Sequence, residues 1–200
     1  MEKQNILLRA RQYIAAETNP AFRSEVEDLV ASGDLEELGD RFYTDLVFGT
    51  GGLRGVIGGG SNRMNPYVVR RATQGVANYI RKSSSRENPS AVIAFDSRRF
   101  SDAFAKETAL VFCGNGIKTY LFTALRPTPE LSFAVRHLGA TAGVVVTASH
   151  NPAEYNGYKV YWSDGGQIVP PHDAGIIAEA RSVAEITGMS MEEARERGLL

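Results

Sequence analysis

Apolar positions in the second half of the chain form short runs, separated by segments with helical spacing. The runs at 91–95, 117–122, 142–146 and 157–162 are typical of buried strands. Ser101 is expected to cap a helix that ends near Gly114 or Gly116, and Thr128-Pro129 begins another that Gly139 stops. Strands separated by helices of this length predict an α/β fold with a mostly parallel sheet flanked by helices.

The first 45 residues predict an N-terminal helical extension made of short helices. Gly33 breaks a run of acidic and apolar positions, and Asp34 is expected to cap the next short helix. Asn65 and Pro66 open a longer helix with apolar positions at helical spacing. Seven glycines lie between positions 49 and 60, where the sequence predicts a loop. This loop fits neither G-x-x-x-x-G-K-[ST] nor G-x-G-x-x-G, so neither nucleotide-binding fingerprint applies.

The length of 200 residues suits one good-sized domain. We assign this domain to residues 1–188 and interpret 189–200 as a linker or the start of a truncated second domain. No segment approaches the roughly 20 apolar residues of a membrane span, and the N-terminus lacks the features of a secretory signal. The single cysteine, Cys113, cannot form an internal disulfide, which favours a reducing compartment and a cytoplasmic location. No stripe of basic and aromatic residues supports nucleic-acid binding.

Positive charge is concentrated in the middle of the chain, where residues 48–99 hold nine Lys/Arg against two Asp/Glu. Such a block favours an anionic ligand. Four of these cations lie at helical positions and are interpreted as solvating the outside of one helix: Arg70, Arg71, Arg81 and Lys82. Three others lie in or beside predicted loops, where a ligand could reach them: Arg54, Arg98 and Arg99.

The candidate chemistry lies where predicted strands end, because open parallel sheets bind ligands beyond the carboxyl ends of their strands. Segments 96–99, 125–128 and 147–152 leave the sheet at such ends. Ser149 follows a buried strand directly, so its hydroxyl should be held rigidly at the crevice. His150 can exchange a proton near neutral pH, and Lys159 could return to the same place. The alternative is a turn serine that bonds its own backbone.

Arg54 is set among glycines, which would let its guanidinium approach a phosphate with little steric obstruction. Asp96, at a predicted strand end, could orient Arg98 or Arg99, or could cap local amides. No Cys/His cluster suggests zinc, and no two aspartates are spaced two residues apart.

Five motifs occur together in an order that resembles the first domain of the α-D-phosphohexomutase family (phosphoglucomutase and phosphomannomutase). They are F-G-T-G-G-L-R-G at 48–55, A-F-D-S-R at 94–98, R-P-T-P at 126–129, T-A-S-H-N-P at 147–152 and N-G-Y-K at 156–159. The resemblance covers residues 42–180, and T-A-S-H-N-P is its most specific part. The stretch G-S-N-R-M-N at 60–65 is most similar to the long-chain branch, which includes phosphopentomutases and glucose-bisphosphate synthases.

The resemblance implies that a phosphoserine at Ser149 exchanges its phosphoryl group with a sugar phosphate through a sugar bisphosphate intermediate, with a sugar 1,6-bisphosphate as activator. Phosphate would move between C1 and C6 of a hexose, or C1 and C5 of a pentose. Magnesium would bind through the phosphate on Ser149 together with an aspartate-rich loop. The resemblance assigns His150, Lys159 and Arg54 to the reacting centre. It assigns phosphate binding or support to Thr50, Gly51, Asp96, Arg98 and Asn151.

The chain departs from the family pattern because the magnesium loop, the sugar-reading loop and the second phosphate clamp lie on later domains of the family. We therefore expect a fragment whose partners are a sugar phosphate and the rest of its parent chain. The 200 residues alone should be inactive, and which sugar phosphate is used is not determined by them. Two alternatives are a hydrolase using Ser149, which lacks a G-x-S-x-G elbow, and a phosphosugar-binding or phosphoserine-regulated module that transfers nothing.

Overall fold

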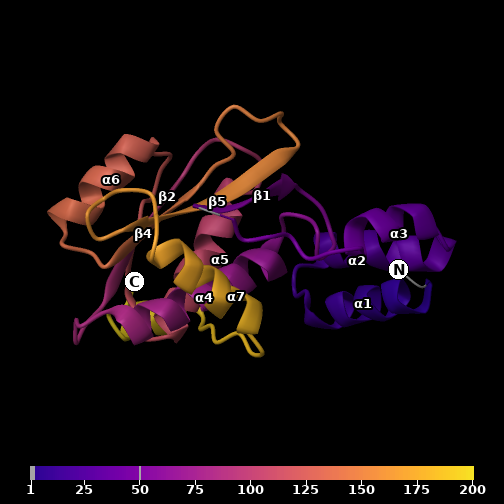
Figure 1. Cartoon of the computed structure of the whole chain (residues 1–200), viewed down its shortest axis with the longest axis horizontal. Coiled ribbons are helices and arrows are strands. Elements are labelled where there is room, and N and C mark those ends of the chain that lie inside the picture. Colours follow the sequence, from indigo (N-terminus) through magenta and orange to yellow (C-terminus); the bar gives the residue numbers. More distant parts are fainter. Residues whose placement is uncertain (1–2, 50) are drawn as a thin grey trace.

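A single five-stranded sheet forms the centre of the computed structural model, which describes residues 3–49 and 51–200 (Figure 1). The strands are β1 (Gly52–Val56), β2 (Ser90–Phe95), β3 (Lys118–Leu121), β4 (Ala142–Val146) and β5 (Tyr155–Trp162), in the order β1-β5-β4-β2-β3. β2 is parallel to β3 and β4, whereas β5 is antiparallel to β4 and β1. Four of the five described strands therefore point the same way, and their carboxyl ends meet at one edge.

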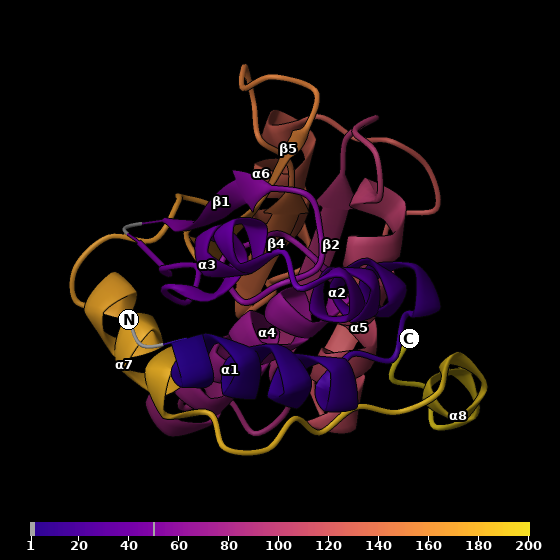
Figure 2. The ribbon, with the colours of Figure 1, turned by 90° about the vertical axis from the view of Figure 1, so that its right-hand side faces the viewer.

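Helices cover both faces of the sheet and also form the N-terminal extension (Figures 1 and 2). The described helices are α1 (Lys3–Ala16), α2 (Pro20–Ser32), α3 (Leu35–Phe42), α4 (Pro66–Ser83), α5 (Ser101–Gly114), α6 (Thr128–His137), α7 (His172–Ser182) and α8 (Met191–Glu196). α4 packs between α5 and α7, while α6 packs against β2 and β4. The α/β class and the N-terminal helical extension are thus confirmed.

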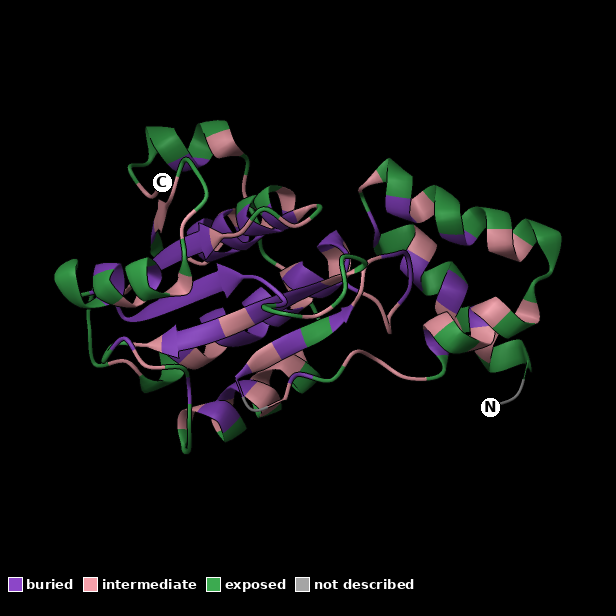
Figure 3. Ribbon diagram, turned by 90° about the horizontal axis from the view of Figure 1, so that it is seen from above, coloured by how far each residue is buried: buried purple, intermediate pink, exposed green. Residues whose placement is uncertain are grey.

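Side chains of the central strands alternate between two apolar clusters, as expected for a sheet covered on both faces. Val144 and Val146 belong to the larger cluster with α4 and α5, whereas Val145 belongs to the cluster beneath α6. The continuous burial of β4 is visible in Figure 3. This rigid strand leads directly to Ser149.

Three local predictions need correction. β1 lies in the glycine-rich segment that was expected to be a loop. β5 begins at Tyr155 and runs antiparallel, because the short connection from β4 contains no crossover helix that could return the chain for parallel pairing. Ser101 is the first residue of α5 rather than its cap; Phe100 occupies the cap position without a side-chain cap, and the Ser101 hydroxyl donates to Asp96 instead.

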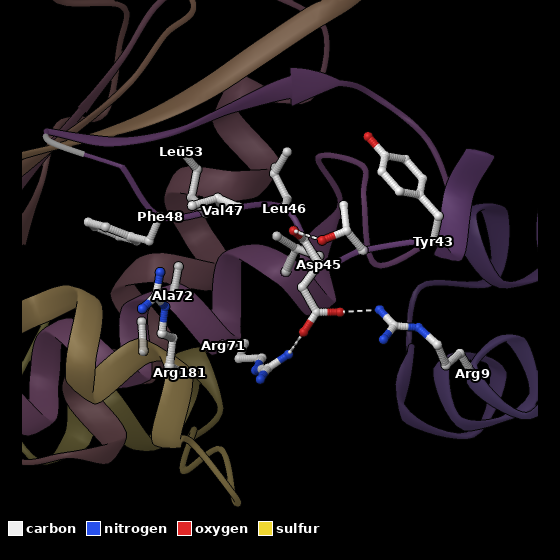
Figure 4. Close-up of a pocket in the computed structure, with 13 residues that line it drawn as sticks. Arg9, Tyr43, Asp45, Leu46, Val47, Phe48, Leu53, Arg71, Ala72 and Arg181 are labelled. Carbon is white, nitrogen blue, oxygen red and sulfur yellow. Dashed lines mark hydrogen bonds and ion pairs between the residues drawn. The ribbon is translucent and has the colours of Figure 1, made fainter. Parts of the chain in front are cut away.

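Ion pairs join Asp45, which follows the extension, to arginines of α1 and α4. The prediction that Arg70 and Arg71 only solvate the outside of α4 is therefore wrong. Arg71 binds Asp45 at 2.9 Å, and Arg9 of α1 binds the other oxygen of Asp45 at 2.5 Å. Figure 4 shows this bridge beside a pocket of about 450 Å³. Arg70 lies 3.5 Å from the buried carboxylate of Glu17.

The other two cations of α4 are exposed as predicted, and Lys82 pairs with Glu179 at 2.7 Å. At the end of the chain, the carbonyl oxygen of Leu199 accepts from the backbone N–H of Thr119 on β3 at 2.7 Å. Within the described residues, none of the helices has both the length and the apolar character that crossing a membrane requires.

Candidate functional site

The loop after β4 presents Ser149 on a short rigid stem. Thr147 and Ala148 are buried, whereas Ser149 is exposed. Ser149 has a φ of 55°, in the left-handed region that side chains other than glycine seldom adopt. Its backbone N–H donates to the Thr147 hydroxyl at 3.0 Å. A strained backbone at an exposed hydroxyl is typical of functional positions, where the surroundings hold the geometry.

The Arg98 side chain holds this loop by donating hydrogen bonds to backbone carbonyl oxygens. Its Nη1 donates to the carbonyl oxygens of Pro152 (2.8 Å) and Tyr155 (3.1 Å). Its Nη2 donates to those of Ser149 (2.8 Å) and Asn151 (2.7 Å). The side chain is only 14 % exposed; its bonds to Tyr155 and Asn151 are partly buried, those to Pro152 and Ser149 are exposed, and all four are charge-assisted. The Arg98 side chain therefore supports the loop by bonding to the loop's backbone carbonyls, and none of its terminal N–H groups is left free for a phosphate.

Asp96 and Asn156 hold the neighbouring chain segments together. Asp96 accepts from the Arg98 backbone N–H at 3.0 Å and from the Ser101 hydroxyl at 2.7 Å. The fully buried amide of Asn156 donates to the same hydroxyl at 3.0 Å and accepts from the Gly157 N–H at 2.7 Å. The network joins the end of β2, the start of α5 and the start of β5. Asp96 both orients Arg98, at 3.5 Å from its Nε, and caps a local amide.

Lys159 reaches Ser149 from the middle of β5, with its Nζ 2.5 Å from the Ser149 Oγ. Arg54 of β1 pairs with Gly157, so Arg54 and Lys159 lie on the same face of the sheet. A Cβ at Gly157 would lie 2.5 Å from the carbonyl oxygen of Thr147. Glycine is therefore required where the stem of the serine loop crosses close to β5.

The two cations at this face influence each other. Burial lowers the pKa of the Lys159 ammonium, the nearby charge of Arg54 lowers the pKa further, and Asp96 opposes the shift. Arg54 is exposed, and none of the described residues forms a hydrogen bond or ion pair with its guanidinium. Exposed positive charge beside the serine hydroxyl suits the stabilisation of a phosphate.

The remaining predicted site residues take different places. His150 is exposed next to Ser149. Asn151 contributes its carbonyl to Arg98, and its Oδ1 is buried without a partner among the described residues. The carbonyl of Gly51 accepts from Gln167 at 3.3 Å and from Val160 N at 3.1 Å, so its backbone is used in packing β1 to β5. Thr50 lies outside the described residues.

The described residues do not by themselves provide a magnesium site, since no three His, Cys, Asp or Glu side chains come together in them. Asp96 is the carboxylate that follows β2 beside the serine loop, and its oxygens are already engaged by Arg98 and Ser101. A cavity of about 320 Å³ opens next to Asp96 and Arg98. The larger pocket of Figure 4 is not lined by any predicted site residue.

Thr147 and Asn156 lie within the quoted motifs, but no individual role was predicted for either residue. A threonine two residues before a strained serine, and an asparagine where β5 begins, are signals for turn support that could have identified them. The partners of Arg98 gave no such signal, because they are backbone carbonyls.

Residues 45–187 match the family model described as phosphoglucomutase/phosphomannomutase, alpha/beta/alpha domain I. The chain belongs to this family. The helices α1–α3 precede the matched residues, so the extension lies outside the part that defines the family domain.

Relatives within the family agree with the predicted long-chain branch. The chain is 48 % identical over 157 residues to a Schizosaccharomyces pombe protein named probable phosphoribomutase, covering 78 % of this chain and 27 % of that protein. It is 41 % identical over 172 residues to mouse phosphopentomutase, covering 82 % and 28 %. The solved open form of parafusin (phosphoglucomutase) from Paramecium has a TM-score of 0.66 at 21 % identity, covering 78 % and 29 %, and shows a common fold. The chain thus spans just over a quarter of these curated relatives.

Proposed function

We propose that this chain is the phosphoserine-bearing first domain of a longer phosphosugar mutase, with Ser149 as the residue that receives and donates the phosphoryl group. The observation that carries the proposal is the contact between the Ser149 Oγ and the Lys159 Nζ at 2.5 Å, at the end of a fully buried strand. Ser149 is exposed and held by bonds to its backbone, so its hydroxyl is available to a ligand.

The proposed step exchanges one oxygen–phosphorus bond for another. A sugar hydroxyl attacks the phosphorus of phosphorylated Ser149, the bond from phosphorus to Oγ breaks, the sugar hydroxyl loses its proton and Oγ gains one. Lys159 lies where its ammonium can give a proton to Oγ, and its lowered pKa makes this donation easier. Arg54 supplies positive charge to the phosphate oxygens, and His150 is assigned to proton exchange with the sugar.

The rest of the site would come from outside these residues. We assign a domain boundary near residue 188 because the family match ends at residue 187. Residues 189–200 would lead to the next domain after packing on this one, where Leu199 accepts from Thr119. Magnesium, bound through phospho-Ser149 and aspartates of another domain, would neutralise phosphate charge when present. A sugar 1,6-bisphosphate is the proposed activator, and the choice between hexose and pentose phosphate is assigned to the later domains.

Activity of the complete parent protein tests this proposal. With glucose 1-phosphate or ribose 1-phosphate, magnesium and a bisphosphate activator, Ser149→Ala should abolish turnover. Ser85→Ala is the matched control, since Ser85 is an exposed serine in the loop that follows α4, and it should leave turnover unchanged. The 200 residues alone should unfold cooperatively but show no turnover, because positioning a sugar phosphate needs contacts on both of its sides. Turnover by the Ser149→Ala protein would refute the proposal.

A module that is phosphorylated at Ser149 but transfers nothing is the second candidate. The isolated domain provides residues on only one side of the proposed substrate site, which favours this second candidate for the domain on its own. Exchange of label between Ser149 and a sugar bisphosphate in the parent protein would exclude it.

A further inference from the structure

The glycine-rich connection between β1 and α4, residues 57–65, is gripped by the N-terminal extension. Each of the three extension helices makes a hydrogen bond to it. Arg9 of α1 donates to the Ser61 hydroxyl at 2.9 Å. Glu25 of α2 accepts from the backbone N–H of Gly59 at 2.8 Å. Arg41 of α3 donates to the carbonyl oxygen of Gly59 at 3.0 Å. These contacts satisfy both backbone groups of Gly59.

Glu25 and Arg41 also bind each other at 2.9 Å, and Arg41 binds Glu37 at 2.8 Å. Isolated ion pairs at a surface contribute little, because water screens them and their side chains are mobile. Here the Arg41 side chain is 18 % exposed, and its guanidinium is held at once by a carbonyl and by the carboxylates of Glu25 and Glu37, whose side chains are 44 % and 40 % exposed. The Glu25–Arg41 pair is therefore a fixed clamp on Gly59.

The 57–65 connection also packs closely against the extension. A Cβ at Gly59 would overlap the carbonyl oxygen of Phe22 and lie 2.8 Å from the Val26 side chain, both on α2. The Asn62 N–H donates to the carbonyl oxygen of Arg41 at 3.0 Å. The glycines at this point let the backbone lie directly on the extension.

The clamped connection is in turn bonded to the end of β1. The Met64 N–H donates to the carbonyl oxygen of Val56 at 2.8 Å, and the Gly58 N–H donates to that of Met64 at 3.1 Å. The buried Asn65 amide donates to the carbonyl oxygens of Gly58 (2.9 Å) and Gly60 (2.8 Å). Among the described strands, β1 lies at the edge of the sheet beside β5, so this connection is a further support of its carboxyl end, next to the bond from the Ile57 N–H to the carbonyl oxygen of Glu154 at 2.8 Å. Arg54 lies two residues before that end.

We propose that the extension is a positioning device for Arg54, in which Glu25 and Arg41 hold the 57–65 connection and thereby fix β1 beside Lys159 and Ser149. The inference rests on the proposed function, because it assigns to Arg54 the task of contacting the phosphate. Glu25 and Arg41 are positioning residues: they touch the connection and reach the phosphate only through β1.

A double-mutant cycle in the complete parent protein tests the coupling. Arg41→Gln should lower kcat/KM about tenfold in the wild-type background, mainly through kcat, because misplaced positive charge is felt most at the transition state. In the Arg54→Gln background the same change should cost less than about twofold, since the effects of residues that are coupled through a shared backbone segment are not additive. Arg23→Gln is the control: Arg23 lies on α2 in an exposed pair with Glu27. Equal losses in both backgrounds, or no loss in either, would overturn the proposal.

Hydrogen exchange gives a readout that needs no activity. In the 200-residue chain, Arg41→Gln should speed exchange at the amides of residues 52–57 at least about threefold, while the amides of β4 keep their protection. Should Arg41→Gln not fold, Arg41→Lys and Glu25→Gln offer milder changes to the same clamp. Unchanged exchange in β1 for folded variants would contradict the inference. A wild-type parent protein that transfers no phosphate would instead refute the proposed function, and the exchange result would still decide whether the clamp supports β1.

Discussion

Two arginines near Ser149 have opposite surroundings. Arg98, in the segment after β2, gives its four terminal N–H groups to carbonyls of the serine loop. Arg54, on the edge strand β1, has an exposed guanidinium and no partner among the described residues. Positive charge near a nucleophile therefore serves two purposes here. Arg98 holds the backbone of the serine loop, whereas the Arg54 guanidinium remains free for a ligand. We expect substitution of Arg98 to lower the stability of the domain and substitution of Arg54 to lower the activity of the parent protein.

The largest effect should come from removing the support of the serine loop. Arg98→Ala removes four charge-assisted hydrogen bonds that hold the serine loop and the start of β5, so the free energy of unfolding should fall by about 3 kcal/mol. Arg99→Ala, at the exposed neighbour whose guanidinium lies over the Phe100 ring, should change it by less than about 0.5 kcal/mol. Urea denaturation of the 200-residue chain measures both. Similar values for the two variants would show that the loop does not depend on Arg98.

Arg54 should show the reverse pattern, with activity reduced and stability kept. Arg54→Lys retains the charge but loses the planar fork that binds two phosphate oxygens. In the parent protein kcat/KM should fall at least about tenfold, which corresponds to roughly 1.4 kcal/mol of transition-state stabilisation, with an unchanged denaturation midpoint. Unchanged kinetics would assign Arg54 to structure and remove the contrast with Arg98.

The smallest effect concerns the proton affinity of Lys159. Because the charge of Arg54 lowers the pKa of Lys159, Arg54→Gln should raise it. Acylating reagents react with the neutral amine, so the pH dependence of Lys159 labelling should move to higher pH in Arg54→Gln. Arg99→Gln should leave the profile in place. A profile that stays, or moves to lower pH, would mean that the two cations do not interact as their shared face of the sheet suggests.

Much of the fold could be predicted because its signals are local. The caps at Asp34 and Asn65 form as expected, with each side chain accepting from an N–H of its own helix. The buried strand before Ser149 is a continuous apolar run, so its position could be inferred directly. β1 could not be predicted, because its glycine-rich sequence has little strand propensity and it is held by β5 and the 57–65 connection, which are tertiary contacts.

The same distinction applies to the site. Ser149 and Lys159 were named from their motifs; their side chains contact each other, and their roles stay a prediction. The role of Arg98 in holding the serine loop could not be predicted from the sequence, because its hydrogen-bond partners are main-chain carbonyl oxygens, which every residue type carries. The ion pairs of Arg70 and Arg71 also depend on where α1 docks, which helical spacing in α4 does not encode.

The position of the phosphate is the most direct test of the central claim that Ser149 bears the phosphoryl group. The complete parent protein would be incubated with glucose 1,6-bisphosphate, and its intact mass and peptide map recorded beside those of Ser149→Ala. The prediction is a gain of one phosphoryl group, located on the peptide that contains Ser149 and absent from the variant. Phosphate found at another residue, with Ser149 unmodified in an active preparation, would contradict the claim.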